Sequence, residues 1–363
     1  MVVQRALPPQ GGRAWRHPRV TAARLVFGLV LFLSTLFVVG APASAATNVL
    51  DVPWYLQKTG AYCGPASMQM VFDYWGPLVD QREIALGVDV YGHNGMSPPA
   101  AIRGATFSDL SYLSGPSLEL QGYPERKLGY AAFYYQGDPW QPQLKALIDQ
   151  GYPILVRTWY SVDPSGKYSD AISAANLTGH MRVVTGYDDQ GDIIVNDPWG
   201  RDLYKKLMDF QGEIIYTSEA FQKIWDYRDS AAYFIAPWKV DVVITGTGPD
   251  YTVTATATYP CPPPFDTAVN VAGNMAASPS MTLSLPSGVT STDPLVQTRA
   301  AALAPGSSWT TTWHVTAGAT SSFTASVTAE GTVSPTLYDL TLGTVETGST
   351  DRIGGSGTAT LGA

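Results

Sequence analysis

The sequence is poor in cysteine and in charged side chains. Only two of its 363 residues are cysteine, so at most one disulfide can form, which excludes the disulfide-dense scaffolds common among small exported proteins. Charged residues make up 14% of the chain, and the formal net charge is −8. This acidic balance argues against a nucleic-acid partner, because such a partner requires a basic face. The length and the hydrophobic fraction of 45% predict about two domains with enough apolar side chains for a sizeable core.

Long apolar runs are also scarce, and the one that approaches a membrane span lies near the amino terminus. Residues 25–39 form this run of about 15 residues, which is shorter than the ~20 that cross a bilayer comfortably. Five arginines precede the run, and Ala43, Ser44 and Ala45 follow it with the small side chains of a signal-peptidase site. We therefore expect residues 1–45 to be a signal peptide and the rest of the chain to be secreted or extracellular. The alternative is that residues 25–39 stay uncleaved and tether the protein to a membrane.

Residues 46–238 combine helical and strand-like patterns, as in an α+β domain. Residues 64–75 are expected to form a helix, because Pro65 suits its first turn and Gly76 ends it. The other expected elements are a strand-like segment at 52–57, helices at 141–150 and 218–227, strands at 153–156 and 232–235, and a hairpin of residues 181–187 and 192–196 that turns at 189–191.

Residues 239–345 have a different composition. Thr, Ser, Ala, Gly and Val dominate, charges are sparse, and polar and apolar residues alternate with a period of two. Short strands without helices predict an all-β sandwich, and the segment at 303–307 resembles part of immunoglobulin-like (Ig-like) accessory domains. Residues 346–363, rich in glycine, serine and threonine, are expected to form a flexible tail. The expected strands are 240–245, 251–259, 281–285, 308–315 and 322–329.

Cys63 lies where a loop meets the helix expected at 64–75. The free N–H groups and partial positive charge of a helix N-terminus stabilise a thiolate. Cysteines so placed, with a histidine nearby, have pKa values of roughly 3.5–7.5 instead of ~8.5. Gly64 and Pro65 allow the sharp turn that presents such a side chain. Cys63 is therefore a candidate nucleophile, and the alternatives are a structural cysteine or a disulfide with Cys261.

A thiolate nucleophile needs a base, and the chain has only four histidines. His17 lies in the amino-terminal segment and His314 in the β-rich region, which leaves His93 and His180. His93 lies in a glycine-bounded loop, where a solvated histidine is usual. His180 begins a strand that enters the core, where an imidazole normally has a polar partner. His180 is the candidate base, and a purely structural histidine is the alternative.

Asp197 is the candidate partner of His180. If the hairpin turns at residues 189–191, position 180 comes close to Asp197, which follows the second strand. An acceptor there can hydrogen-bond the second imidazole nitrogen and fix its tautomer. The alternative is that Asn196, Asp197 and Pro198 simply form the turn that ends the strand.

Gln57 lies six residues before Cys63. Attack of a thiolate on a carbonyl develops negative charge on the carbonyl oxygen, and each donor placed there lowers the barrier by about 2.7–4 kcal/mol. The side-chain amide of Gln57 and the backbone N–H of Cys63 could form such a pair. An ordinary surface glutamine is the alternative.

Four separated motifs carry a resemblance to a known family. In order, they are residues 51–57 (DVPWYLQ), 62–67 (YCGPAS), 179–187 (GHMRVVTGY) and 195–199 (VNDPW). Together they resemble the C39-like peptidase family, a member of the papain-like clan of cysteine peptidases, over residues 48–237. The resemblance implies an α+β papain-like cysteine peptidase domain at 46–238, followed by the Ig-like sandwich at 239–345. By this resemblance the nucleophile would be Cys63, the general base and acid His180, the orienting acid Asp197 and the oxyanion donor Gln57.

The function that this resemblance implies is that of an exported thiol protease acting on peptide bonds. Its mechanism requires no metal or organic cofactor, and the sequence has no cluster with metal-ligand spacing. The expected partners are a peptide or protein substrate and, through the β-rich region, a cell surface or cell wall. Three other functions stay open: an amidase or transpeptidase acting on cell-wall amides, a catalytically inactive surface binding module, and a structural protein locked by a disulfide between Cys63 and Cys261.

Overall fold

The computed structural model describes most of the chain after residue 46. The described ranges are 47–76, 79–87, 96–108, 127–162, 168–169, 177–199, 212–226, 229–318, 322–334, 336–339, 344–347 and 350–362. The expected signal peptide at 1–45 and the alternative histidine, His93, lie outside the described residues. Within the described ranges, no helix combines the length and the hydropathy that crossing a membrane requires.

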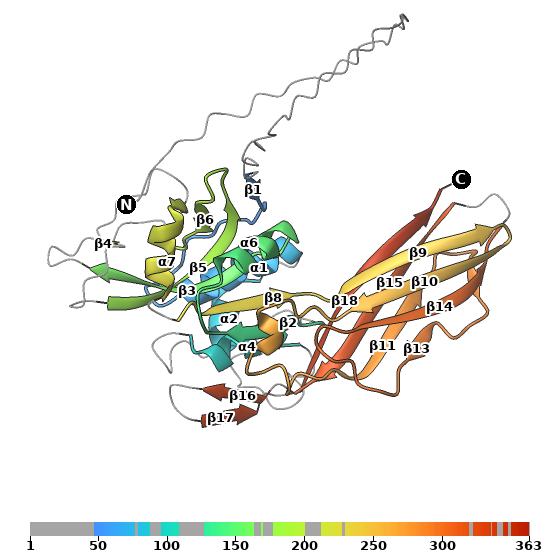
Figure 1. Cartoon of the computed structure of the whole chain (residues 1–363). Coiled ribbons are helices and arrows are strands. Elements are labelled where there is room, and N and C mark those ends of the chain that lie inside the picture. Colours follow the sequence, from blue (N-terminus) through green and yellow to red (C-terminus); the bar gives the residue numbers. More distant parts are fainter. Residues whose placement is uncertain are drawn as a thin grey trace, which may run out of the picture.

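A large antiparallel sheet forms the centre of the first part of the protein (Figure 1). Its main order is β2-β8-β3-β5-β6-β7, with β1 paired to β5 and β4 paired to β3. The strands are β1 (Asn48–Val49), β2 (Ala131–Tyr135), β3 (Ile154–Val162), β4 (Tyr168–Ser169), β5 (Leu177–Tyr187), β6 (Ile193–Asn196), β7 (Glu213–Tyr216) and β8 (Ala232–Ala236).

Helices cover both faces of this sheet. On one face, α1, α2 and α4 share a buried apolar cluster with Leu155 of β3. On the other face, α6 and α7 share a second cluster with the neighbouring residues Ile154 and Val156. The two clusters separate in this way because successive side chains of a strand point to opposite faces. The helices are α1 (Cys63–Trp75), α2 (Gln81–Gly87), α4 (Pro98–Thr106), α6 (Gln141–Asp149) and α7 (Ser218–Asp226).

Most of the elements predicted for this part are confirmed. The predicted helices correspond to α1, α6 and α7, and the predicted strands to β3, β5, β6 and β8. The strand-like segment expected at 52–57 is wrong, because no regular strand forms there. Its backbone groups bond side chains and a loop instead: the Val52 carbonyl accepts from Nδ2 of Asn196 (2.9 Å), and the Gln57 N–H donates to the Pro198 carbonyl (2.8 Å).

Two four-stranded antiparallel sheets form most of the C-terminal part, in the orders β12-β14-β10-β9 and β13-β11-β15-β18. Buried and exposed side chains alternate along these strands, and the buried ones belong to one apolar cluster. The all-β pattern is thus confirmed, and an Ig-like topology stays a prediction. The elements are β9 (Lys239–Thr247), β10 (Asp250–Thr258), the 3₁₀ helix η2 (Phe265–Thr267), β11 (Ala277–Ser284), β12 (Thr290–Ser291), β13 (Val296–Thr298), β14 (Ser308–Thr316), β15 (Phe323–Val333), β16 (Thr336–Asp339), β17 (Thr344–Thr347) and β18 (Asp351–Leu361).

The flexible tail expected at 346–363 is wrong over most of its length. β18 (Asp351–Leu361) pairs with β15 from end to end. Two of its glycines are required by a close approach to β9 and the residue before it, because a Cβ atom would lie 1.9 Å from the Val240 carbonyl oxygen at Gly357 and 2.0 Å from the Trp238 carbonyl oxygen at Gly355. A composition that is usual for a flexible tail therefore belongs here to a paired strand whose glycines leave no room for a side chain.

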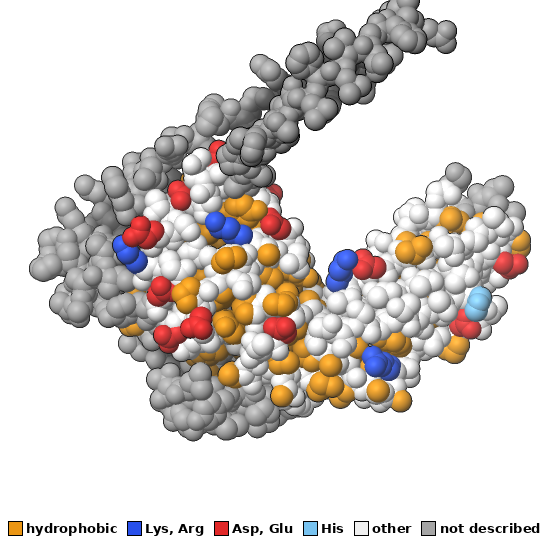
Figure 2. Space-filling view, in the orientation of Figure 1, with side chains coloured by type: hydrophobic (Ala, Val, Ile, Leu, Met, Phe, Trp, Pro, Cys, Tyr) orange, Lys and Arg blue, Asp and Glu red, His pale blue; other side chains and the backbone are white. Residues whose placement is uncertain are grey.

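The two parts of the protein share one continuous core. Trp238 stacks on Tyr259 with ring centroids 5.1 Å apart. The buried side chain of Asn270 accepts from the N–H of Tyr134 and donates to the carbonyl of Ala132, so it closes part of the edge of β2. In the space-filling view, hydrophobic side chains gather over the first part and along the junction, whereas the visible face of the C-terminal part carries few charges (Figure 2). The C-terminal part is therefore built into the fold and is not joined by a linker.

Replacing Gly355 by alanine tests whether β18 is an integral strand. The new Cβ atom meets backbone that cannot move away cheaply, so we expect the free energy of unfolding to fall by about 1–3 kcal/mol. Gly362→Ala is the matched control, because nothing lies within 4 Å of a Cβ atom there, and its effect should stay within about 0.5 kcal/mol. Denaturant unfolding curves of both variants provide the measurement, and equal stabilities would contradict the integral strand.

Candidate active site

Cys63 is the first residue of α1, and its side chain is partly buried. The helix N-terminus there carries no side-chain cap, so its N–H groups remain available to favour a thiolate. Gly64 allows a close approach to the rest of the site, because a Cβ atom there would lie 2.7 Å from the Met96 side chain and 3.1 Å from the sulfur of Met181. Cys63 and Cys261 are both free thiols, so the alternative of a disulfide between them finds no support.

His180 lies on β5 and is 2% exposed. The predicted hairpin is confirmed: β5 pairs with β6, and the turn is closed by the hydrogen bond from the Asp188 N–H to the Asp192 carbonyl (3.0 Å). This pairing brings His180 and Asp197 together as the sequence predicts, with 2.8 Å between Nε2 and Oδ1. The other ring nitrogen, Nδ1, is buried and is the one left for the Cys63 thiol.

Asp197 is held from several sides. Its Oδ2 accepts a hydrogen bond from Nε of Arg182 (2.7 Å), and its Oδ1 also accepts from the Trp199 N–H (2.8 Å). Its own N–H donates to the Gly212 carbonyl (2.7 Å). The carboxylate is 1% exposed, so neither of its oxygens can exchange these partners for bulk water. Asp197 can therefore hold the His180 ring in one orientation.

The charges of these groups stabilise one another. Burial raises the pKa of Asp197, but the charges and hydrogen bonds of His180 and Arg182 outweigh it and hold that pKa far below its ordinary value. Burial lowers the pKa of His180, but Asp197 and then Cys63 outweigh it and raise the pKa to about 10. Burial raises the pKa of the Cys63 thiol, but the hydrogen bond and charge of His180 outweigh it, and the net pKa is lowered. The site therefore favours a thiolate beside an imidazolium.

Arg182 is a site residue that the sequence analysis missed. Its side chain is fully buried, and its Nη1 donates to Oγ1 of Thr158 (2.5 Å) while the guanidinium lies 5.6 Å from the ring centroid of Tyr216. The sequence does hold a signal, because an arginine two residues after His180 on one strand must face the same side of the sheet. A charge in an otherwise apolar run normally has a charged partner, and here that partner is Asp197.

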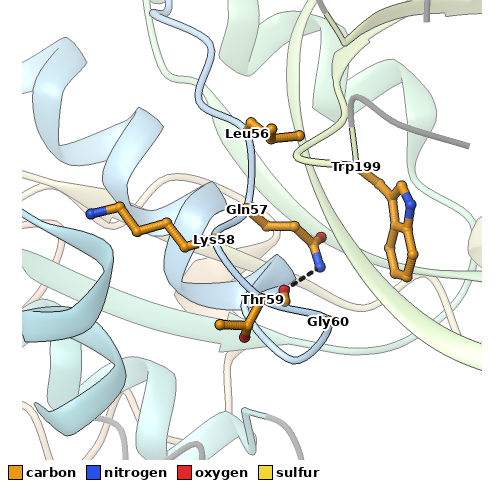
Figure 3. Close-up of a pocket in the computed structure, with 6 residues that line it drawn as sticks. All are labelled: Leu56, Gln57, Lys58, Thr59, Gly60 and Trp199. Atoms are coloured by element: carbon orange, nitrogen blue, oxygen red, sulfur yellow. Dashed lines mark hydrogen bonds between the residues drawn. The ribbon is translucent and has the colours of Figure 1, made fainter. Parts of the chain in front are cut away.

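Gln57 lies in the loop before α1, on a different segment from Cys63, His180 and Asp197. Its side chain extends toward Trp199, and its Nε2 donates to the Thr59 carbonyl (2.7 Å; Figure 3). The same carbonyl accepts from the N–H of Tyr62 (3.2 Å), the residue that precedes Cys63. A shared acceptor thus links the Gln57 amide to the start of α1, and one Nε2 proton is left over for another acceptor.

A pocket of about 380 Å³ opens between this loop and Trp199 (Figure 3). The Trp199 ring stands edge-to-face to the imidazole of His180, with 6.0 Å between the centroids. One wall of the pocket, Trp199, therefore contacts the candidate base, although His180 itself does not line the pocket. The lining residues are Leu56, Gln57, Lys58, Thr59, Gly60 and Trp199. Across the described ranges, no three or more His, Cys, Asp or Glu side chains gather where they could hold a metal ion.

A cysteine at a helix N-terminus, a histidine beside it and a buried carboxylate on that histidine make up the arrangement of a nucleophilic hydrolase site. The family model described as the Peptidase_C39 like family matches residues 49–233, and the chain belongs to this family. No curated protein sequence matches the chain.

Two solved structures give low similarities. The peptidase domain of Streptococcus ComA, described as a bifunctional ABC transporter involved in a quorum-sensing pathway, is 18% identical with a TM-score of 0.32 and covers 51% of this chain and 98% of its own. The Fcho1 Mu homology domain of Danio rerio, with a bound Eps15 peptide, is 13% identical with a TM-score of 0.23 and covers 58% of this chain and 98% of its own. Neither similarity is high enough to indicate a shared activity.

Proposed function

We propose that the protein is an exported cysteine peptidase that hydrolyses peptide bonds through Cys63, His180 and Asp197. One observation carries the proposal: the buried imidazole of His180 bonds the Asp197 carboxylate through Nε2, and the hydrogen bonding and charge of the same imidazole lower the pKa of the Cys63 thiol at the start of α1. Membership of the Peptidase_C39 like family supports a peptidase. A structural histidine would need neither a thiol at a helix N-terminus nor a lowered thiol pKa.

The mechanism begins with the charged pair. The Cys63 thiolate attacks the peptide carbonyl carbon, and the negative charge moves to the carbonyl oxygen, where the Cys63 N–H and the remaining Nε2 proton of Gln57 donate to it. The imidazolium of His180 gives its proton to the leaving amine as the C–N bond breaks, which leaves a thioester on Cys63. Neutral His180 then takes a proton from water, and the resulting attack releases the acid and restores the thiolate. Asp197 holds the ring in place through both steps.

The proposed substrate is a peptide or protein outside the cytoplasm. The arginines, the apolar run and the Ala43-Ser44-Ala45 sequence support export by residues 1–45. The C-terminal sheets offer a surface for contact with a cell wall or cell surface. The same thiolate chemistry could serve a cell-wall amidase or a transpeptidase, and comparing cleavage of peptide mixtures with cleavage of peptidoglycan fragments separates these activities.

The pH dependence of Cys63 alkylation by iodoacetamide tests the proposal. Because the pKa of the thiol is lowered, the thiolate and the fast reaction should persist to a pH well below ~8.5, the ordinary value. In His180→Ala the rate should rise only near that ordinary value, and at pH 6 it should be about 10- to 100-fold slower than in the wild type. Equal, slow alkylation of both proteins, followed by mass spectrometry, would overturn the activated thiolate.

A further inference from the structure

Gln81 hydrogen-bonds the backbone of the residues on either side of Gln57. It is the first residue of α2 and is 2% exposed. Its Nε2 donates to the carbonyl of Leu56 (2.9 Å), and its Oε1 accepts from the N–H of Lys58 (2.9 Å). One side chain therefore bonds the backbone on both sides of Gln57, as a neighbouring strand would do in a sheet.

A second buried amide, that of Gln69, connects Gln81 to α1, the helix that carries Cys63. The other Nε2 proton of Gln81 donates to Oε1 of Gln69 (2.9 Å), which is 6% exposed and lies on α1. α1 begins at Cys63, so the loop of Gln57 and the helix that carries the thiol are tied through two side chains. From the opposite side, the N–H of Gln57 donates to the Pro198 carbonyl, next to Asp197.

The amide of Gln81 is suited to hold one position. Both of its N–H groups and its oxygen are used, and burying an amide is costly unless such partners are present. Moving the Gln57 loop would break two of these bonds at once. An exposed ion pair between Lys58 and Asp80, at the start of α2, adds a further link. The loop lacks a regular strand, so these side chains, together with the bond from the Gln57 N–H to the Pro198 carbonyl, hold it in place.

We propose that Gln81 is a positioning residue that sets the place of the Gln57 amide relative to Cys63. The inference rests on the proposed function, in which Gln57 donates to the oxyanion. Donation to an oxyanion depends steeply on position, and a displacement of about 1 Å can cost about 10²-fold in rate. Gln81 touches neither the substrate nor the thiol; it acts through Gln57.

Two reactions of Cys63 separate positioning from general damage. Acylation by the p-nitrophenyl ester of an N-acyl amino acid forms a sulfur–acyl bond, expels p-nitrophenolate and passes through an oxyanion. Alkylation by iodoacetamide forms a sulfur–carbon bond, expels iodide and develops no oxyanion. Both reactions need the thiolate, so their ratio reports on the oxyanion donor. Gln57→Ala should slow acylation by about 10²-fold and Gln81→Met by about 10-fold, with alkylation unchanged in both.

A double variant shows whether Gln81 acts through Gln57. Residues that act as a unit are not additive, so in a Gln57→Ala background Gln81→Met should slow acylation by no more than about 2-fold further. Tyr74→Phe is the control, because it also removes a hydrogen bond of α1, to the Gly151 carbonyl, far from the loop; it should leave both rates unchanged. If Gln81→Met does not fold, Gln81→Glu removes the donors while keeping the acceptor for Lys58.

The outcomes distinguish the two proposals. Normal acylation of the Gln81 variant, with slow acylation of Gln57→Ala, would overturn the positioning role alone. An equal loss of acylation and alkylation in the Gln81 variant would also overturn it, because that result indicates a structural role. If the ester does not acylate Cys63 in the wild type at all, the proposed function fails, and the positioning role fails with it.

Discussion

Hydrolysis of peptide bonds is expected to fall by about 10⁴- to 10⁶-fold when Cys63 is replaced by alanine, as is general for loss of a nucleophile that acts with its base. His180 cannot readily take its place as a nucleophile, because its Nε2 is tied to Asp197. The measurement is the rate at which new amino termini appear in a peptide mixture, followed by mass spectrometry. The fold should be retained, because the side chain is only partly buried and a small one replaces it.

Cys261→Ser is the matched control and should keep full activity. The thiol of Cys261 is buried in the C-terminal part and donates to the Phe265 carbonyl (3.4 Å). Burial and, secondarily, Asp266 raise the pKa of Cys261 to about 12, so this thiol is protonated at neutral pH. Wild-type activity in Cys63→Ala would contradict the proposed nucleophile. An absence of activity on every amide in the wild type would favour a surface binding module.

Replacing Asp197 by asparagine is expected to impair both catalysis and stability. The rate should fall by about 10²- to 10⁴-fold, because an amide cannot hold the imidazolium in its tautomer and orientation. The free energy of unfolding should fall by about 3–5 kcal/mol, since Arg182 is left as a buried charge without its counter-ion. Denaturant unfolding and peptide cleavage, measured on the same sample, give the two effects.

The double variant Arg182→Met with Asp197→Asn is the control for this result. Removing both charges should recover much of the stability lost in the single variant, because no unpaired buried charge remains, yet the activity should stay low. The pKa of Asp197 is lower in the folded protein than its ordinary 3.8, so its contribution to stability is present above about pH 4 and is lost as the pH falls further. The difference in stability between wild type and Asp197→Asn should therefore shrink in acid, and a difference that grew in acid would contradict the buried ion pair.

The contact between His180 and Asp197 can be predicted from the sequence because it depends on local rules. A turn at residues 189–191 fixes the register of two short strands, and the register fixes which residues meet across them. The bounds of α1 can be predicted equally well, since Pro65 and Gly76 are strong signals for the start and the end of a helix. These local signals are enough to predict the position of the candidate nucleophile, Cys63, and the contact between His180 and Asp197.

Other parts of the site depend on contacts between distant segments. Gln81 acts on residues 56–58 across more than twenty positions, and a glutamine at the start of a helix has no sequence signal that sets it apart. Arg182 had a signal, its charge within an apolar strand, but its partner becomes evident only once Asp197 is known to be buried. The strand expected at 52–57 failed for the same reason, because distant partners took up its hydrogen-bonding groups.

The C-terminal tail shows a limit of composition as a guide. Glycine, serine and threonine in residues 346–363 are typical of a flexible segment. In β18 the glycines at 355 and 357 are required because the backbone of Trp238 and of Val240 in β9 passes so close that a Cβ atom has no room. Only the neighbouring strand distinguishes a flexible tail from a paired strand, and the sequence of the tail alone does not predict where that neighbour lies.

The most direct test of Cys63 as an activated nucleophile is to trap the acyl group that it forms. The wild-type protein is mixed with the p-nitrophenyl ester at pH 6 and quenched in acid, and the attached group is located by peptide mass spectrometry. Since the pKa of the Cys63 thiol is lowered and that of Cys261 is raised to about 12, one acyl group per chain should be found on Cys63 and none on Cys261. Acylation of both cysteines to the same extent, or of neither, would contradict a thiolate–imidazolium pair at Cys63 and His180.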